Sequence, residues 1–296
     1  MPRTRGEKAF AIVNNVALFV LGLVMIFPFY VTLVNSISPG IDFATKTIIL
    51  WPSTVDLSAY KALVGVNTGL LNALTLTVGI TVVGTLMNMF FTLLGAVALS
   101  NRNLPYRPAI TMFFVLTLYF GPGMIPAYLV NKYLGLINNL WVMIVPGLIS
   151  VMYMLYMRNF IAKIPHEIIE SASIDGCSDI AMVPAIILPL STAAIATFSL
   201  FYAVGHWNDF YSCAMYITDP KMHNLQVYLT NLLQDSRNMR LNPEELQKMY
   251  EAGRRPPPSE TMKAANIMAA TIPIVCVYPF LQKYFVKGMV VGSLKG

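Results

Sequence analysis

Long apolar runs are the sequence feature that most limits what this chain can fold into. One run extends from about residue 10 to 34 and another from about residue 70 to 99. Each is longer than the roughly 20 residues that an α-helix needs to cross a bilayer. Only 11% of the 296 residues are charged, which is too little polar surface for a water-soluble fold. We therefore predict an all-α membrane protein.

Breaks of proline, glycine and charged residues divide the apolar sequence into candidate spans. The pattern predicts a single membrane domain, residues 1–296, with six transmembrane helices at about residues 10–34, 70–99, 109–130, 140–157, 184–206 and 264–286. The first run exceeds the apolar region of a signal peptide, so we interpret it as a retained span. In the third, Gly121-Pro122-Gly123 is either a hinge or a simple span end. Residues 158–183 then form an inner loop, and residues 212–263 form the largest segment outside the membrane.

The distribution of lysine and arginine predicts the orientation of these spans. The short outer loops hold only Lys46, Lys61 and Lys132. The opposite side has ten basic residues in its short loops and tails: Arg3, Arg5, Lys8, Arg102, Arg107, Arg158, Lys163, Lys283, Lys287 and Lys295. Basic residues accumulate on the cytoplasmic side. We therefore expect a multi-pass membrane protein with both termini in the cytoplasm.

Several kinds of site are not expected. The net charge of +6 is spread over loop ends without a basic patch interleaved with aromatics, so the pattern does not indicate a nucleic-acid partner. The three cysteines, Cys177, Cys213 and Cys276, have no paired spacing, and the histidines are equally dispersed. Neither a disulfide framework nor a metal site is predicted.

A polar, mostly acidic segment, residues 164–179, stands between two apolar runs. Pro165 suits the first position of a helix, and Gly176 can take a positive φ at a sharp turn. Asp175 or Ser178 can cap a second helix. At helical spacing, Ile168, Ile169 and Ala172 lie on one side, and Glu167, Glu170 and Ser171 lie largely on the other. The segment predicts a short amphipathic hairpin beside the membrane.

The order Glu170-Ser171-Ala172, Asp175-Gly176 and Ile186-x-Leu188-Pro189 resembles the EAA motif of permease subunits in binding-protein-dependent ABC importers. The sequence departs from the family pattern at Ser171 and Cys177, where small residues replace alanines. The likeness covers nearly the whole chain. Further elements resemble the carbohydrate-importing branch: residues 123–128, Leu134-Gly135-Leu136, Trp207-Asn208 and residues 278–288.

The resemblance implies a type I ABC importer fold for sugar transport in the bacterial plasma (inner) membrane. In this family the loop is a coupling helix seated on a cytoplasmic ATPase. The residues expected to couple are Pro165, Glu167, Glu170, Ser171, Ala172, Asp175 and Gly176. The chain lacks the glycine-rich phosphate-binding motif, so we expect a transport subunit rather than an enzyme. It would hold no cofactor, with ATP and Mg in the partner. The implied partners are a second homologous permease, an ABC ATPase dimer, an extracytoplasmic solute-binding protein, an oligosaccharide substrate and membrane lipid.

Two polar stripes are either helix-packing seams or parts of a translocation path. The second span carries Thr77, Thr81, Gly84, Thr85, Asn88, Thr92 and Gly95, and the fifth carries Thr192, Ala196, Ser199, Ala203 and His206. After the fifth span, Trp207 with its polar neighbours suits either a sugar ring or the membrane interface. The candidate path residues are Asn88, Tyr119, Ser199, His206, Trp207, Asn208 and Asp209.

Three other functions compete with this interpretation. An ion-coupled secondary transporter requires ionisable residues inside the membrane, and the predicted spans hold them only near their ends. An intramembrane enzyme would need a nucleophile or metal motif that the sequence lacks. The third alternative is an ABC importer permease for a non-sugar solute. The only argument against it is the resemblance to the carbohydrate-importing branch. The sequence leaves open which sugar is carried, and whether it is neutral or acidic.

Overall fold

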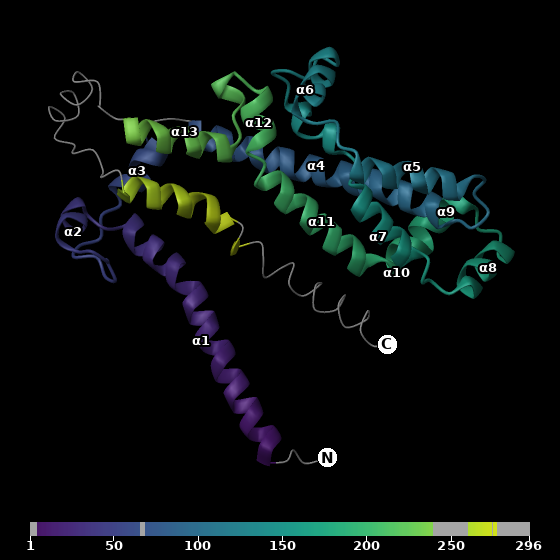
Figure 1. The fold of residues 1–296 in the computed structure, drawn as a ribbon, viewed down its shortest axis with the longest axis horizontal. Helices are drawn as coiled ribbons and strands as arrows, with labels where there is room; N and C mark the ends of the chain where they lie inside the picture. The colour runs from purple at the N-terminus through teal and green to yellow at the C-terminus, as the bar shows by residue number, and fades with distance from the viewer. Residues whose placement is uncertain (1–4, 66–68, 239–259, 274, 277–296) are drawn as a thin grey trace. The chain divides into compact units, whose positions relative to one another are not determined.

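A computed structural model describes residues 5–65, 69–238, 260–273 and 275–276 (Figure 1). The described residues form two compact units. The first comprises 5–65, 229–238 and 260–273, and the second comprises 69–228 and 275–276. Throughout these ranges the regular structure is helical. Two predicted segments lie partly outside the described residues. They are residues 239–259 of the predicted outer loop and residues 277–286 at the end of the predicted sixth span.

The first unit is dominated by one long helix. Helix α1 (Arg5–Ser36) contains a segment, Phe10–Ser36, that is long and apolar enough to cross a membrane. In the most apolar window of this segment no residue is buried inside the protein. Its Phe, Leu and Val side chains are therefore available to lipid or to another subunit.

The C-terminal end of α1 is fixed by hydrogen bonds to the rest of this unit. The hydroxyl of Tyr60, in helix α3 (Ser58–Gly65), donates to Ser36 Oγ at 2.8 Å. Thr261, in the helical residues 260–273, donates from Oγ1 to the carbonyl of Ser38 at 3.0 Å. Ser36 and Ser38 are fully buried. The end of the apolar helix is thereby tied to segments far away in the sequence.

A charged clip closes the loop after α1. Helix α2 (Gly40–Thr45) carries Asp42, whose carboxylate accepts from the Ser53 N–H at 2.8 Å and pairs with Lys46 at 2.9 Å. The hydrogen bond from Ser53, followed by that from Lys46, lowers the pKa of Asp42 below its ordinary value. The side chain thus holds two ends of the loop together while it is ionised.

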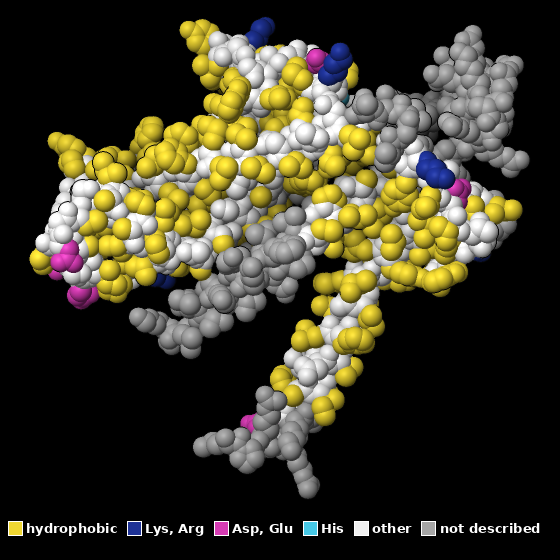
Figure 2. Space-filling view, turned by 180° about the vertical axis from the view of Figure 1, so that it is seen from behind, with side chains coloured by type: hydrophobic (Ala, Val, Ile, Leu, Met, Phe, Trp, Pro, Cys, Tyr) yellow, Lys and Arg dark blue, Asp and Glu magenta, His cyan; other side chains and the backbone are white. Residues whose placement is uncertain are grey.

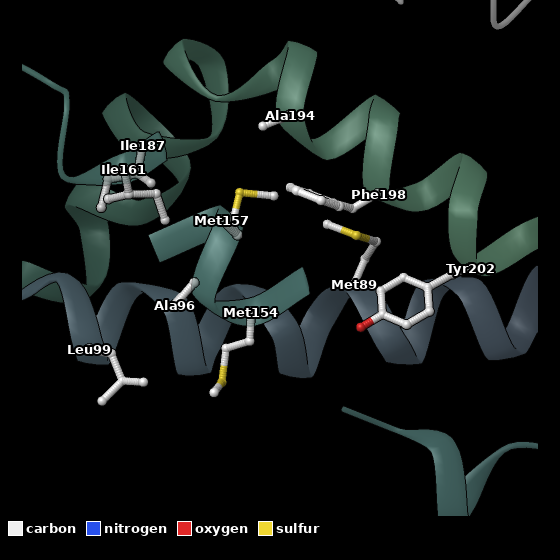
Figure 3. Close-up of a cluster of buried hydrophobic side chains, with 10 residues drawn as sticks. All are labelled: Met89, Ala96, Leu99, Met154, Met157, Ile161, Ile187, Ala194, Phe198 and Tyr202. Atoms are coloured by element: carbon white, nitrogen blue, oxygen red, sulfur yellow. The ribbon is translucent and has the colours of Figure 1, made fainter. Parts of the chain in front are cut away.

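The second unit is built around α4 (Gly69–Ser100), which forms its longest helix. Helices α7 (Val151–Ile161) and α11 (Thr192–Trp207) pack against α4. Figure 3 shows the apolar cluster that joins them: Met89, Ala96, Leu99, Met154, Met157, Ile161, Ile187, Ala194, Phe198 and Tyr202. Small residues on α4 allow this close approach, because a Cβ on Gly95 would lie 2.5 Å from Met154 Sδ.

The other predicted spans of this unit are broken helices. Helix α5 (Arg107–Tyr119) meets α6 (Met124–Tyr133) at 114°, and the break contains Gly121-Pro122-Gly123. Within the described residues, two helices are long and apolar enough to span a membrane, or up to five if each bent pair is one span. The predicted count of six therefore stays a prediction.

Two of these breaks differ from the sequence-based expectation. Residues 140–150 form two 3-10 turns, η1 (Leu140–Met143) and η2 (Val145–Gly147), rather than the first part of an α-helix. The stretch of α9 (Asp179–Met182), the π-helical turn η3 (Val183–Ile187) and α10 (Leu188–Leu190) bends by 84° before α11. The predicted span at about residues 184–206 is therefore bent near its start, because proline removes backbone donors at Pro184 and Pro189.

The two ends of the second unit carry short helices. Helix α8 (His166–Ile174) and α9 lie at the end where α4 meets α5 (Figure 1). Toward the start of α4 lie α12 (Tyr211–Tyr216), η4 (Pro220–Met222) and the first residues of α13 (Leu225–Asn238). Figure 2 shows hydrophobic side chains over much of the surface, with acidic side chains gathered at the α8 end.

Candidate functional site

The predicted coupling segment folds as the expected hairpin, and its turn depends on Gly176. After α8, the N–H of Gly176 donates to Ser173 O at 3.1 Å, and that of Cys177 donates to Ala172 O at 2.9 Å. These two bonds form a Schellman motif, which satisfies the last carbonyls of a helix. Gly176 has φ = +83°, so the prediction of a positive φ is confirmed.

The two helix starts of the hairpin are defined by Pro165 and Ser178. Pro165 stands one position before the helix, as its N-cap with φ = −55° and ψ = 134°, and α8 begins at His166. The expectation that Pro165 is the first helical residue was therefore wrong by one position, a common shift at helix ends. Ser178 caps α9, since its Oγ accepts from the Ala181 N–H at 3.3 Å.

The hairpin presents both charge and apolar surface to its surroundings. Glu167, Glu170, Ser171 and Asp175 are exposed, whereas Ala172 is half-buried. Ile174 and Ile180, on either side of the turn, are each 86% exposed. Large apolar side chains in an acidic, polar segment are typical of a surface that another protein covers.

A buried polar network lies in the middle of the same unit. Asn88, on α4, is 1% exposed. Its Nδ2 donates to the carbonyls of Gly147 at 2.6 Å and Leu148 at 3.1 Å. These carbonyls belong to the break between η2 and α7, so they lack partners within a regular helix. Asn88 therefore satisfies the backbone of a broken helix.

His206, on α11, completes the hydrogen bonding of Asn88. Its Nε2 lies 2.8 Å from Asn88 Oδ1. Because Nδ2 of Asn88 faces two carbonyl oxygens, the amide orientation is fixed and Oδ1 acts as the acceptor. His206 thus donates from Nε2. The pair joins α4, α11 and the η2–α7 break through one side chain.

Tyr202 stabilises the other side of the same break. Its hydroxyl lies 2.7 Å from Thr92 Oγ1 and accepts from the Ser150 N–H at 3.1 Å. Ser150 is the extended residue before α7 and caps that helix with its own hydroxyl. Sequence inspection did not single out Tyr202 or Ser150. The sequence does contain a signal for this site, because Pro146-Gly147 lies shortly before Ser150. This pair marks a helix break whose backbone groups need hydrogen-bond partners.

For part of α4, the structure supports the packing alternative. A Cβ on Gly84 would lie 2.5 Å from Nε2 of His206, and Thr77 Oγ1 accepts from the Leu225 N–H at 2.8 Å. On α11 the most buried side chains are Ala194, Phe198 and Tyr202. The predicted small stripe on α11 is less buried, and Thr192, at its start, is exposed. The most buried face of α11 is therefore formed by Ala194, Phe198 and Tyr202 rather than by the predicted stripe.

The remaining candidate path residues are distributed differently. Tyr119, at the end of α5, is 79% exposed, and Ser199 is half-buried. Trp207 Nε1 is buried without a hydrogen-bond partner among the described residues. Asn208 donates from Nδ2 to Val204 O at 3.0 Å, and Asp209 Oδ1 accepts from the Ser212 N–H at 3.0 Å. Only Asn88 and His206 of the seven contact each other through a hydrogen bond between their side chains in the described part of the chain.

A second set of hydrogen bonds ties the segment after α11 to the rest of this unit. Asn224 donates from Nδ2 to the carbonyl of Asp209, and its own N–H donates to Cys213 Sγ at 3.3 Å. Burial raises the pKa of the Cys213 thiol. Asn138 Oδ1 accepts from the N–H and the hydroxyl of Thr218, at 2.6 and 2.9 Å. These bonds connect the first part of the predicted outer loop to the chain just after α11 and to the turn before η1.

No group of three or more His, Cys, Asp or Glu side chains suited to a metal ion occurs among residues 5–65, 69–238, 260–273 and 275–276. The polar chemistry of the described chain is that of hydrogen bonding and exposed carboxylates.

Curated relatives resemble the chain over its full length. Protein LplC of Bacillus subtilis is 38% identical over 296 residues, which is 100% of this chain and 98% of the relative. The polygalacturonan/rhamnogalacturonan transport system permease protein YtcP of the same organism is 38% identical over 279 residues, 94% of this chain and 96% of the relative. No family model matches the chain.

A solved structure has the same fold. It is the crystal structure of a bacterial ABC transporter involved in the import of the acidic polysaccharide alginate. Its matching chain aligns with a TM-score of 0.86 and 28% sequence identity, covering 96% of this chain and 99% of that chain. The overall fold of this chain is thus one already observed in an ABC transporter.

Proposed function

Because the chain belongs to the permease subunits of sugar ABC importers, we propose that it forms one half of a membrane channel for oligosaccharides and is driven through its α8–α9 hairpin. As a permease subunit it resides in a membrane, it is a transport component rather than an enzyme, and ATP hydrolysis takes place in a separate subunit. The finer assignments below are proposals.

The exposed apolar residues of the hairpin are the observation that carries this proposal. Ile174 and Ile180 are each 86% exposed beside the Gly176 turn. Burying an isoleucine side chain contributes about 2 kcal/mol, so a partner groove that covers both gains substantial binding energy. Glu167, Glu170, Ser171 and Asp175 form the polar rim of this surface, with Pro165, Ala172 and Gly176 setting its shape. We propose a cytoplasmic ABC ATPase as the partner.

The helices that follow the hairpin supply a route for the movement. Chain continuity links the hairpin through η3 and the bend before α11 to Tyr202 and His206. These two side chains bond to the η2–α7 break and to α4. ATP-driven closure of the ATPase dimer would move the hairpin and, with it, this packed set of helices. Alternating access then follows from two discrete packings of the bundle.

We propose an acidic oligosaccharide as the substrate. The support is the substrate of two similar proteins, the polygalacturonan/rhamnogalacturonan permease YtcP at 38% identity and the alginate importer at 28%. A galactooligosaccharide permease of Bacillus subtilis, GanQ, is 28% identical over 288 residues. Oligogalacturonides are therefore the first substrates to test, and galactooligosaccharides are their neutral counterparts.

The substrate path is proposed to run past Tyr119, Ser199, Trp207, Asn208 and Asp209. Trp207 supports this because its buried indole N–H has no partner among the described residues, and a buried donor without a partner is costly. A sugar hydroxyl would satisfy it. Asn88 and His206 are assigned to the path only as the side chains that hold its wall together.

The remaining assembly is proposed from the family and the charge pattern. A solute-binding protein would deliver substrate on the side of α12 and η4, and a second, homologous permease would complete the channel. Both termini would face the cytoplasm, since basic residues dominate the loops on that side. Reporter fusions to each terminus of the full chain test this orientation.

The proposal is tested on the complex of this permease with its ATPase, partner permease and binding protein. The two quantities measured are ATPase co-purification and ATP hydrolysis. We expect Ile174→Asp and Glu170→Lys to leave the permease pair intact but to reduce ATPase co-purification and hydrolysis stimulated by the binding protein. Glu7→Lys, a charge reversal at an exposed site on α1, is the control and should behave as wild type. If both hairpin variants retain full stimulation, the ATPase does not act through this hairpin.

A further inference from the structure

A shallow cavity between α5 and α7 brings two arginines together. Its volume is about 420 Å³, and its wall comprises Arg107, Pro108, Thr111, Met112 and Val115 of α5 and Arg158 of α7. The two helices pack against each other in the second unit, and α7 also packs against α4. The cavity therefore combines two positive charges from separate helices with a largely apolar wall.

The charges of both arginines lack a counter-ion among the described residues. Arg107 donates from Nε to the carbonyl of Leu99 at 2.7 Å. Arg158 donates from Nε and Nη2 to the amide oxygen of its neighbour Asn159, at 3.3 and 2.9 Å. Each of these acceptors is neutral, and the ion pairs found in the described chain involve other residues. An arginine carries five N–H donors, so donors of both side chains are available to an anion.

The apolar part of the wall continues onto an uncovered face of α5. Helix α5 has no buried residue, and Met112, Phe113 and Leu116 are exposed by 58%, 66% and 45%. A small soluble anion such as phosphate would use the arginines but not this surface. An anionic lipid would use both, with its phosphate between the arginines and its acyl chains along α5.

The position of the cavity along the proposed spans favours the lipid. Arg107 begins α5, and Arg158 is in the last turn of α7. In the proposed orientation, on which this inference rests, both helix ends lie at the cytoplasmic surface. Basic pockets between transmembrane helices at that level bind anionic headgroups.

We propose that Arg107 and Arg158 bind the phosphate of an anionic phospholipid in the cytoplasmic leaflet. The lipid neutralises the two charges, and its acyl chains cover the exposed face of α5. Bound there, it bridges α5 and α7 close to the loop that leads into the coupling hairpin.

Native mass spectrometry of the assembled complex tests this site. Complexes are prepared with phosphatidylglycerol, with zwitterionic phosphatidylethanolamine, or with inorganic phosphate and no added lipid. We expect the wild type to retain phosphatidylglycerol. Arg158→Gln should lower its occupancy about fivefold, because the attraction that one basic residue near the surface contributes corresponds to about that factor in affinity. The double variant Arg107→Gln/Arg158→Gln should retain least.

Arg102→Gln is the matched control, because Arg102 is an exposed arginine in the short loop before α5 but does not line the cavity. It should retain phosphatidylglycerol as the wild type does. Arg158→Gln keeps the test interpretable if Arg107→Gln disturbs the loop through Leu99. Equal retention of both lipids, equal loss in the Arg102 variant, or binding of phosphate without lipid would overturn the proposal. A wild-type complex free of lipid would also overturn it and would indicate that another subunit covers α5.

The lipid measurement is independent of transport. If the complex fails to couple to its ATPase but still retains phosphatidylglycerol through Arg158, the proposed function fails and the lipid site stands. If coupling is normal and the variants at Arg107 and Arg158 retain as much phosphatidylglycerol as the wild type, only the lipid site fails.

Discussion

His206 Nε2 donates to Asn88 Oδ1 across 2.8 Å, and this bond fixes an imidazole directly against the α4 backbone at Gly84. The contact joins residues 118 positions apart in the sequence. It explains why α4 has a glycine where α11 crosses it. A side chain at that position would displace the ring that orients Asn88.

The first prediction concerns Gly84→Ala. The added Cβ would lie 2.5 Å from His206 Nε2, and His206 cannot move away without breaking its bond to Asn88. We expect a loss of about 1–3 kcal/mol in stability, the usual range for overpacking a tight contact. Thermal unfolding of the purified permease pair, followed by fluorescence-detected size exclusion, measures the change.

Gly79→Ala is the control for this substitution. Gly79 lies on the same helix, and a Cβ there has no heavy atom within 4 Å. Alanine is favoured over glycine in a helix by up to about 1 kcal/mol, so this variant should be neutral or slightly more stable. Equal melting temperatures for the two alanine variants would mean that α11 does not approach α4 as closely as described.

The second prediction concerns Tyr202→Phe. The hydroxyl of Tyr202 is the partner of Thr92 Oγ1 and of the Ser150 N–H. Removing it leaves a buried hydroxyl and a backbone donor without this acceptor, which costs about 1–3 kcal/mol. Thermal unfolding should detect this loss, and Tyr202→Phe/Thr92→Val should recover part of it because the polar partner is removed as well.

Tyr156→Phe provides the matched comparison. Tyr156 packs its ring parallel to Phe198 with centroids 6.4 Å apart, and it is half exposed. Loss of its hydroxyl should change stability by less than about 0.5 kcal/mol, as expected for a surface substitution. If both tyrosine variants melt alike, the Tyr202 hydroxyl does not stabilise the break.

The hairpin could be predicted from the sequence because its signals are local. Pro165, Gly176 and Ser178 each act on backbone within a few residues, through restricted φ, a positive φ and a cap. The break at Gly121-Pro122-Gly123 was visible for the same reason. Family resemblance added the role of the segment, which local chemistry does not determine.

The buried network could not be predicted, because its partners are distant in the sequence. The sequence pattern places Asn88 in a polar stripe as a candidate path residue, but its acceptors lie 59 and 60 residues away. Which carbonyls a side chain reaches depends on helix packing. The 84° bend before α11 had a local signal in Pro184 and Pro189, yet proline predicts a break and not its direction.

The third prediction is a pH dependence of the clip around Asp42. Its pKa is lowered by the Ser53 N–H and then by Lys46, so the ionised form is favoured in the folded state. The stabilisation is therefore fully present above the ordinary carboxyl pKa of about 4. It is lost as pH falls through the lower, folded-state pKa. Between about pH 5 and 8 the clip should not respond to pH.

Hydrogen exchange of residues 40–53, corrected for intrinsic rates, measures the clip. Asp42→Asn should raise exchange of the Ser53 amide at neutral pH, since the neutral amide is a weaker acceptor. Lys46→Gln should have a smaller effect, because the bond from Ser53 is the larger cause of the pKa shift. Equal protection in wild type and Asp42→Asn would contradict the proposed contribution of the carboxylate.

The last prediction separates the shape of the coupling hairpin from its contacts. At Gly176, a Cβ has no heavy atom within 4 Å, so Gly176→Ala fills open space. The backbone is nevertheless at φ = +83°, which costs an L-residue about 1–2 kcal/mol. We expect Gly176→Ala to loosen the turn and to reduce hydrolysis stimulated by the binding protein, while the permease pair still assembles.

Gly176→Asn distinguishes backbone strain from loss of a glycine as such. Asparagine adopts left-handed conformations more readily than alanine, although its side chain is larger. If strain at the turn governs coupling, the order of stimulated ATPase activity is wild type, then Asn, then Ala. The partner groove could instead require a residue without a side chain at this position. In that case the Asn variant has lower stimulated ATPase activity than the Ala variant, because its bulkier side chain obstructs docking while the turn itself is preserved.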